Sequence, residues 1–124
     1  MDLTGFKAFD FSEGSPYVSM TKNGLTFNKA VTMKLGCPEY VRLLINYETR
    51  QFVLQACDNT VPRAIKYYRQ GKDVFSVRLN SRDLISTFER LVGTSFEPHG
   101  FRVNGELVDD KTMLFDINAA EELS

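Results

Sequence analysis

Three side chains in this sequence could act as a nucleophile or a base: Cys37, Cys57 and the single histidine, His99. Nucleophilic catalysis would pair a cysteine thiolate with His99 as the base. Cys37 follows a predicted helix end, where the helix dipole disfavours a thiolate. Cys57 ends an apolar strand, which is typical of a small core residue. His99 lies between Pro98 and Gly100, as a loop residue would. These residues do not indicate a cysteine enzyme.

The sequence also gives little sign of a metal or phosphate site. A zinc site needs three or four ligands with close pairs, and the two cysteines form no Cys-x-x-Cys pair. Asp109 and Asp110 are adjacent, so in a strand or turn their side chains point apart. The glycines match neither of the common phosphate-loop patterns. We expect no metal, no cofactor and no ordinary enzyme, unless a carboxylate pair assembles only in the fold.

Positive charge is the chemical feature that remains. One group of cations surrounds a predicted hairpin and its helix: Lys22, Lys29 and Lys34. A second group interleaves cations with Tyr67 and Tyr68, as nucleic-acid surfaces do. Its members are Arg63, Lys66, Arg69 and Lys72. An exposed hairpin with charged edges would carry the same residues, so both interpretations stay open.

The charge balance is uneven along the chain, although the net charge is only -1. Residues 21–102 hold 13 Lys and Arg against 7 Asp and Glu, whereas residues 1–20 and 103–124 are both acidic. A basic middle could bind an anionic partner such as nucleic acid. Alternatively, the acidic ends could fold back on the middle and neutralise it.

Length and composition favour one globular domain. The chain has 124 residues, of which 43% are hydrophobic and 25% charged, as is ordinary for a globular protein. Its first residues show no basic segment followed by an apolar stretch, so we expect no secretory signal. No apolar run approaches the roughly 18 residues of a membrane span, and two cysteines suit a reducing compartment. We therefore expect a cytoplasmic protein without a membrane partner.

Residues 1–16 are predicted to form an N-terminal arm before a single domain at residues 17–124. Phe6, Phe9 and Phe11 fit neither a regular helix nor a regular strand, and turn formers follow them. Three aromatic side chains are costly to leave in water. We expect the arm to dock on the domain or on a partner subunit.

The first half of the domain is predicted to hold two hairpins and a short helix. Asn23-Gly24 suits a two-residue turn with positive φ. The helix covers residues 29–35, with Asn28 as its cap and Gly36 in the left-handed position after it. The run Leu43–Ile45 predicts a strand buried on both faces. The predicted strands are Tyr17–Lys22, Leu25–Asn28, Tyr40–Ile45 and Gln51–Cys57.

The second half is predicted to hold two more hairpins around the main helix, residues 82–92. That helix carries one apolar stripe at helical spacing: Leu84, Ile85, Phe88, Leu91 and Val92. Asn80 or Ser81 would cap it and Gly93 would end it. A short tail helix is expected from Asn118. The predicted strands are Ala64–Arg69, Val74–Leu79, Phe101–Val103, Glu106–Val108 and Thr112–Ile117, with Asn104-Gly105 as the last tight turn.

These elements indicate an α+β fold: antiparallel hairpins form a curved sheet or small barrel, with the residue 82–92 helix packed on it and a short helix at residues 29–35. Strands joined by tight turns pair antiparallel, which excludes a parallel βαβ sheet.

Residues 24–57 resemble the AbrB-like swapped-hairpin module of bacterial transcription regulators. The resemblance rests on a turn glycine and short strand, Gly24–Phe27, a helix that ends in Leu35-Gly36, and the strand pair that follows. It implies an intertwined dimer that binds DNA. Leu25 and Asn28 depart from the arginine and proline usual in the family, and the missing arginine weakens the implied DNA binding.

Three functions are consistent with the sequence. The first is a non-enzymatic binding or regulatory module that acts as a homodimer. The second is a DNA-binding transcriptional regulator that uses the basic middle of the chain. The third is a small-ligand-binding protein or enzyme whose site is not visible in the sequence.

Overall fold

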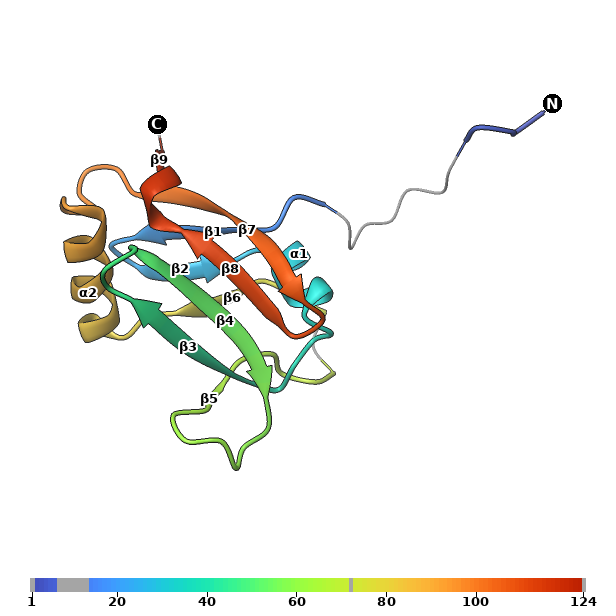
Figure 1. Cartoon of the computed structure of the whole chain (residues 1–124), viewed down its shortest axis with the longest axis horizontal. Helices are drawn as coiled ribbons and strands as arrows, with labels where there is room; N and C mark the ends of the chain where they lie inside the picture. Colours follow the sequence, from blue (N-terminus) through green and yellow to red (C-terminus); the bar gives the residue numbers. More distant parts are fainter. Residues whose placement is uncertain (1, 7–13, 72, 124) are drawn as a thin grey trace.

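The computed structural model describes residues 2–6, 14–71 and 73–123. Nine strands form one sheet, accompanied by two α-helices and a 3₁₀ turn, η2 (Figure 1). The strands are β1 (Tyr17–Thr21), β2 (Gly24–Phe27), β3 (Tyr40–Asn46), β4 (Gln51–Cys57), β5 (Ile65–Lys66), β6 (Val77–Leu79), β7 (Phe101–Asp109), β8 (Thr112–Asp116) and β9 (Glu121–Glu122). The helical elements are α1 (Lys29–Lys34), α2 (Arg82–Val92) and η2 (Ile117–Ala119).

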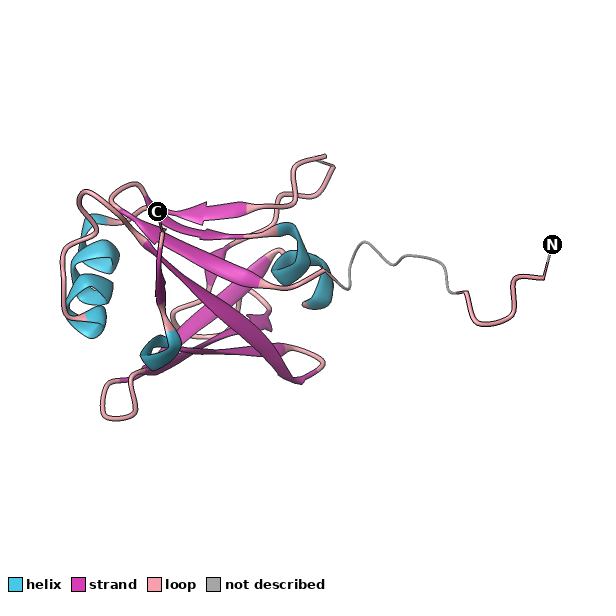
Figure 2. Cartoon of the chain, turned by 90° about the horizontal axis from the view of Figure 1, so that it is seen from above, coloured by secondary structure: helices cyan, strands magenta, loops and turns pink. Residues whose placement is uncertain are grey.

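The strand order is β5-β3-β4-β8-β7-β1-β2-β6, and β9 pairs with β7. All pairs are antiparallel, which confirms the α+β prediction. The hairpins β1–β2 and β3–β4 do not pair with each other, because the hairpin β7–β8 lies between them. The strands cross at a steep angle when the molecule is seen from above (Figure 2), and the sheet curls into a half-barrel.

The core fills the concave side of this sheet. Phe52 is its centre: its ring stacks on Phe115 at 4.7 Å and meets the edge of Phe88 at 4.8 Å. Phe88 is fully buried and comes from α2, which contacts β1, β2 and η2. The apolar stripe predicted for α2 therefore faces the core, as amphipathic spacing requires.

Helix α2 begins and ends at the predicted residues, and α1 begins as predicted but ends one residue earlier, at Lys34. The Asn28 side chain accepts a hydrogen bond from the Val31 amide at 3.2 Å, and Gly36 follows α1 with φ of 82°. Ser81 caps α2, and Gly93 ends it with φ of 98°. Glycine adopts this left-handed conformation without the steric cost of a Cβ. The predicted hairpin β3–β4 is also confirmed.

The predicted third hairpin, Ala64–Arg69 with Val74–Leu79, is wrong. β5 pairs with β3 and β6 pairs with β2, so these neighbouring segments lie at opposite ends of the strand order. The two strands are also shorter than expected, with two and three residues. Burial explains why β6 pairs with β2 and not with β5, because Val77 and Leu79 contact the core from the edge next to β2.

Neither Asn-Gly pair forms the predicted two-residue turn. Each glycine instead lies in a strand, at a point where a Cβ would clash with a neighbouring strand. The first hairpin turns at Lys22 and Asn23, and Gly24 begins β2. A Cβ on Gly24 would lie 2.5 Å from the Leu79 carbonyl oxygen of β6. Gly105 lies in the middle of β7, which runs unbroken through it. There a Cβ would lie 2.7 Å from the Met113 sulfur atom.

Two further predictions are corrected. Leu44 is 42% exposed, so the run Leu43–Ile45 is not buried on both faces. Side chains alternate along a strand, and the outer face of β3 is open. Instead of a tail helix, Asp116 caps η2 and the chain then adds β9 to the edge of β7.

The N-terminal arm is described only in part. Phe6 is 71% exposed and Leu3 is 63% exposed, and the Phe6 amide donates locally to the Leu3 carbonyl oxygen at 3.0 Å. Within residues 2–6 the expected docking on the domain is therefore not seen. Phe9 and Phe11 lie outside the described residues.

Candidate nucleic-acid interface

Helix α1 and the segment that contains β5 form one continuous surface. The Tyr67 amide donates to the Glu39 carbonyl oxygen at 2.8 Å, and the Tyr68 amide donates to the Pro38 carbonyl oxygen at 3.0 Å. The Tyr67 hydroxyl also lies 2.9 Å from the Thr32 hydroxyl oxygen of α1. These contacts bring together the two basic groups that the sequence separates by some 30 residues.

Four cations lie on the two segments that these contacts join, which we call the basic face: Lys29, Lys34, Lys66 and Arg69. The exposed Glu39 lines the same hollow as Lys66 and Arg69. Lys34 is half-buried and the other three are exposed. Within the described residues none of the four has a carboxylate oxygen within 4.0 Å, and the ion pair that is present joins Lys22 to Glu97 at 3.2 Å. No described ion pair links the acidic ends of the chain to these cations.

The remaining predicted cations lie elsewhere. Lys22 is in the β1–β2 turn, at the opposite end of that hairpin from α1. Arg63 precedes β5 and adopts a left-handed φ of 68°. Lys72 lies outside the described residues. The structure thus divides the group Lys22, Lys29 and Lys34 and joins its last two members to the second group.

The two tyrosines of the second group serve the core. Tyr67 and Tyr68 are each 7% exposed, and the Tyr68 ring stacks on Phe75 at 5.4 Å. Burial raises the pKa of Tyr67 well above its ordinary value, and the bond to the Thr32 hydroxyl opposes this only in part. Buried rings cannot stack on nucleobases, so Tyr67 and Tyr68 do not supply the aromatic part of a nucleic-acid surface.

Phe75 and Lys29 connect the two parts of the basic face. The Lys29 ammonium lies 5.3 Å from the centre of the Phe75 ring, close enough for a cation–π contact. A hollow of about 500 Å³ lies on the segment that contains β5. Glu39, Lys66, Tyr67, Tyr68, Arg69 and Gln70 line it. The Gln70 side chain donates from Nε2 to the Cys37 carbonyl oxygen at 3.2 Å, which holds this segment against the end of α1.

The residues considered for catalysis are not brought together. Cys37 follows α1, whereas His99 lies in the loop beside the β1–β2 turn, because the adjacent Gly100 packs against the Met20 carbonyl oxygen. The Asp109 carboxylate accepts from the Lys111 amide at 2.9 Å, which lowers its pKa and shapes the turn before β8. No group of three metal-ligating side chains occurs among the described residues.

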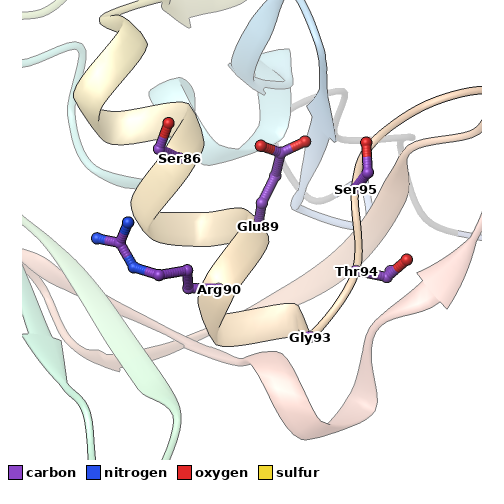
Figure 3. A pocket seen from close by; sticks show the side chains of 6 residues that line it. All are labelled: Ser86, Glu89, Arg90, Gly93, Thr94 and Ser95. Atoms are coloured by element: carbon purple, nitrogen blue, oxygen red, sulfur yellow. The ribbon is translucent and has the colours of Figure 1, made fainter.

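A second hollow, of about 500 Å³, lies at the carboxyl end of α2 (Figure 3). Glu89 and Arg90 line it, but their side chains point to different sides of the helix. The Glu89 carboxylate accepts from the Phe96 amide at 2.8 Å. This acid therefore holds the loop that follows α2, and the hollow does not contain an assembled acid–base pair.

Neither helix of the described residues is long and apolar enough to cross a membrane. Comparison of the chain with protein-family models, curated proteins and solved structures gave no significant match.

Proposed function

We propose that the chain is a non-enzymatic regulatory module that binds the phosphate backbone of DNA through the basic face. The observation that carries this proposal is the set of four cations on two adjoining segments, none with a carboxylate within 4.0 Å in the described residues. Phosphate contacts supply the sequence-independent part of nucleic-acid affinity, and they need cations that are free to exchange counterions for phosphates.

The burial of Tyr67 and Tyr68 favours double-stranded over single-stranded DNA. Single-strand binding surfaces combine cations with aromatic side chains on which bases stack. The basic face offers positive charge, but Tyr67 and Tyr68 add no exposed ring to it. The resemblance of residues 24–57 to the AbrB-like module supports the same proposal, because that segment contributes Lys29 and Lys34 to the surface.

Salt-dependent binding to a mixed-sequence duplex tests the proposal. Wild-type protein is expected to bind a 30-base-pair duplex at about 50 mM salt and to release it as salt rises. Lys29→Gln, Lys34→Gln, Lys66→Gln and Arg69→Gln should each weaken binding and reduce the slope of log affinity against log salt by about 0.9 per lost contact.

Lys22→Gln is the matched control, because Lys22 is an exposed lysine at the far end of the first hairpin and is paired with Glu97. It should leave the salt slope unchanged. A wild-type protein without measurable affinity at about 50 mM salt contradicts the proposal. Equal losses from Lys22→Gln and Lys29→Gln would also contradict it, because they would indicate general attraction to a positively charged chain.

We further propose that the protein is a cytoplasmic homodimer. Both cysteines are free thiols, as suits a reducing compartment. Leu3 and Phe6 expose apolar surface that a second subunit could cover. Light scattering on the full chain should give a mass near 28 kDa, twice the 14.1 kDa of one chain. A chain that begins at Ser15 tests the arm: its dissociation to monomers supports a role for residues 2–6, and a persistent dimer excludes that role.

A further inference from the structure

The half-barrel is open between β6, the strand at one end of the sheet, and the part of β3 that extends beyond its short pairing with β5. On its outer side β3 pairs with β5 only at Tyr40 and Val41, and β6 pairs with β2 alone. Along an antiparallel edge, alternate residues direct their backbone N–H and C=O groups away from the sheet. Residues 42–46 and 77–79 therefore present backbone groups without a strand partner within the described part of the chain.

A hollow of about 410 Å³ lies between these two edges. Its apolar lining comes from both sides: Leu43, Ile65, Leu79 and Leu84. Arg78, Asn80 and Ser81 complete the lining. Ile65 is 38% exposed, so part of this apolar surface faces water. Unpaired strand edges beside an apolar hollow are the features that accept an added strand.

The chain's own β5 stops short of this opening. Val41 pairs with Ile65, so the residues before Ile65 would continue opposite Arg42 and Leu43 if the strand were longer. Instead Arg63 turns into the left-handed region, with φ of 68°, and the Ala64 amide donates back to the Val61 carbonyl oxygen at 3.1 Å. The chain thereby leaves the edge of β3 after two paired residues.

Charge indicates which peptide would fit. Arg78 is the one ionisable side chain in the lining; it is exposed, and its Nε donates to the Thr26 hydroxyl at 3.2 Å. Within the described residues no carboxylate lies within 4.0 Å of its guanidinium group. Arg63, two residues before β5, adds positive charge on the other side. The two nearest acids in the sequence are Asp73 and Asp83, each five residues from Arg78, and Asp83 belongs to the first turn of α2.

We propose that this opening binds a short, extended, acidic peptide segment of a partner protein as an additional strand. The peptide lies in line with β5 and antiparallel to β3. Its alternate apolar side chains contact Leu43, Leu79 and Leu84, and a carboxylate between them pairs with Arg78. Backbone hydrogen bonds supply affinity in such complexes, and the side-chain contacts supply specificity.

Selection from a phage-displayed library of random nonapeptides, with the full chain as bait, tests the proposal. The expected enriched sequences carry apolar residues at alternate positions and Asp or Glu between them. With Arg78→Glu as bait, the enriched sequences should exchange these acids for Lys or Arg. Arg69→Glu changes the charge equally on the basic face and should leave the acidic pattern intact, which separates this proposal from DNA binding.

A synthetic peptide of the enriched sequence then tests strand addition. N-methylation of alternate backbone amides on the side facing β3 should weaken binding at least tenfold, and methylation of the other amides should not. No enrichment, the same enrichment with Arg78→Glu, or equal binding of both methylated peptides overturns the proposal. Occupation of this opening by a second copy of the chain would also overturn the proposal. In that case light scattering would show a dimer that Ile65→Glu converts to a monomer.

Discussion

The Arg50 side chain donates from Nε to the Leu91 carbonyl oxygen at 2.9 Å, and from Nη2 to the Val92 carbonyl oxygen at 3.1 Å. The last carbonyl groups of a helix have no partner within the helix, and the helix dipole makes this end negative. Arg50 stands in the β3–β4 turn, and its own carbonyl oxygen accepts from the Ile117 amide at 2.9 Å. One residue thus fixes α2 and η2 to the same turn.

Arg50→Met should lower the free energy of unfolding by about 1.5–3 kcal/mol, because hydrogen bonds from a charged group contribute that much and the helix carbonyls lose their cap. Chemical denaturation monitored by circular dichroism measures the change. Arg90→Met is the matched control, since Arg90 is an exposed arginine in the last turn of the same helix. A similar loss from both variants would show that Arg50 has no special role.

Phe88→Ala should lower the free energy of unfolding by about 3–5 kcal/mol, since it removes a fully buried ring from between α2 and Phe52. This is a large part of the stability of a typical domain. Thermal melting gives a first measure and chemical denaturation a second. Phe6→Ala is the comparison: Phe6 is 71% exposed, and its replacement should leave both measures unchanged. A melting temperature of Phe88→Ala within two degrees of wild type would show that α2 is not packed on Phe52.

Tyr67→Phe should cost about 1–3 kcal/mol at neutral pH, because the buried Thr32 hydroxyl loses its partner. Burial raises the pKa of Tyr67 in the folded chain above its unfolded value of about 10. Its contribution to stability is therefore complete below pH 10 and is lost as the pH rises further, because the unfolded chain ionises first.

Denaturation curves from pH 8 to pH 11.5 test the pH dependence. Wild-type stability should decrease more steeply above pH 10 than that of Tyr67→Phe, so the two curves should converge. Parallel curves over this range would contradict the raised pKa of Tyr67.

Gly24→Ala should destabilise the protein by at least 2 kcal/mol. The new Cβ would lie 2.5 Å from the Leu79 carbonyl oxygen, and Gly24 has φ of 129°, where other residues are strained. Hydrogen exchange should show the loss first at β6, which pairs only with β2. Asn23→Ala, one residue earlier in the exposed turn, serves as the control. If both variants exchange alike, the close approach of Gly24 and Leu79 does not hold.

The sequence predicts those elements whose determinants are local. The stripe around Phe88, the Ser81 cap and Gly93 all act within one helix, and α2 forms as expected. Pairing between distant segments could not be predicted in this way. Asn104-Gly105 has the composition of a tight turn, but Gly105 is required because Met113 and Phe115 of β8 pack over it. That need depends on a partner strand, which the local pattern does not identify.

For the candidate interface, the residue types could be predicted from the sequence, but the way they are brought together could not. Lysine and arginine types and their spacing indicate candidate anion-binding residues, and the structure brings the segment of Lys66 and Arg69 against the helix that carries Lys29 and Lys34. Their meeting depends on the pairing of β5 with β3 and on the bond between Thr32 and Tyr67. Whether a tyrosine is buried or exposed depends on the same contacts, so the role of Tyr67 could not be read from its neighbours in sequence.

The position of β7–β8 between the two earlier hairpins determines when this chain can fold during its synthesis. β1 and β4 each need a strand from residues 101–116 as their neighbour. When a ribosome has completed residue 100, the half-barrel is still in two separate parts. Proteins dominated by such distant contacts fold slowly, and their exposed edges favour aggregation meanwhile. A nascent chain of this protein is therefore expected to bind chaperones until residues 101–116 emerge.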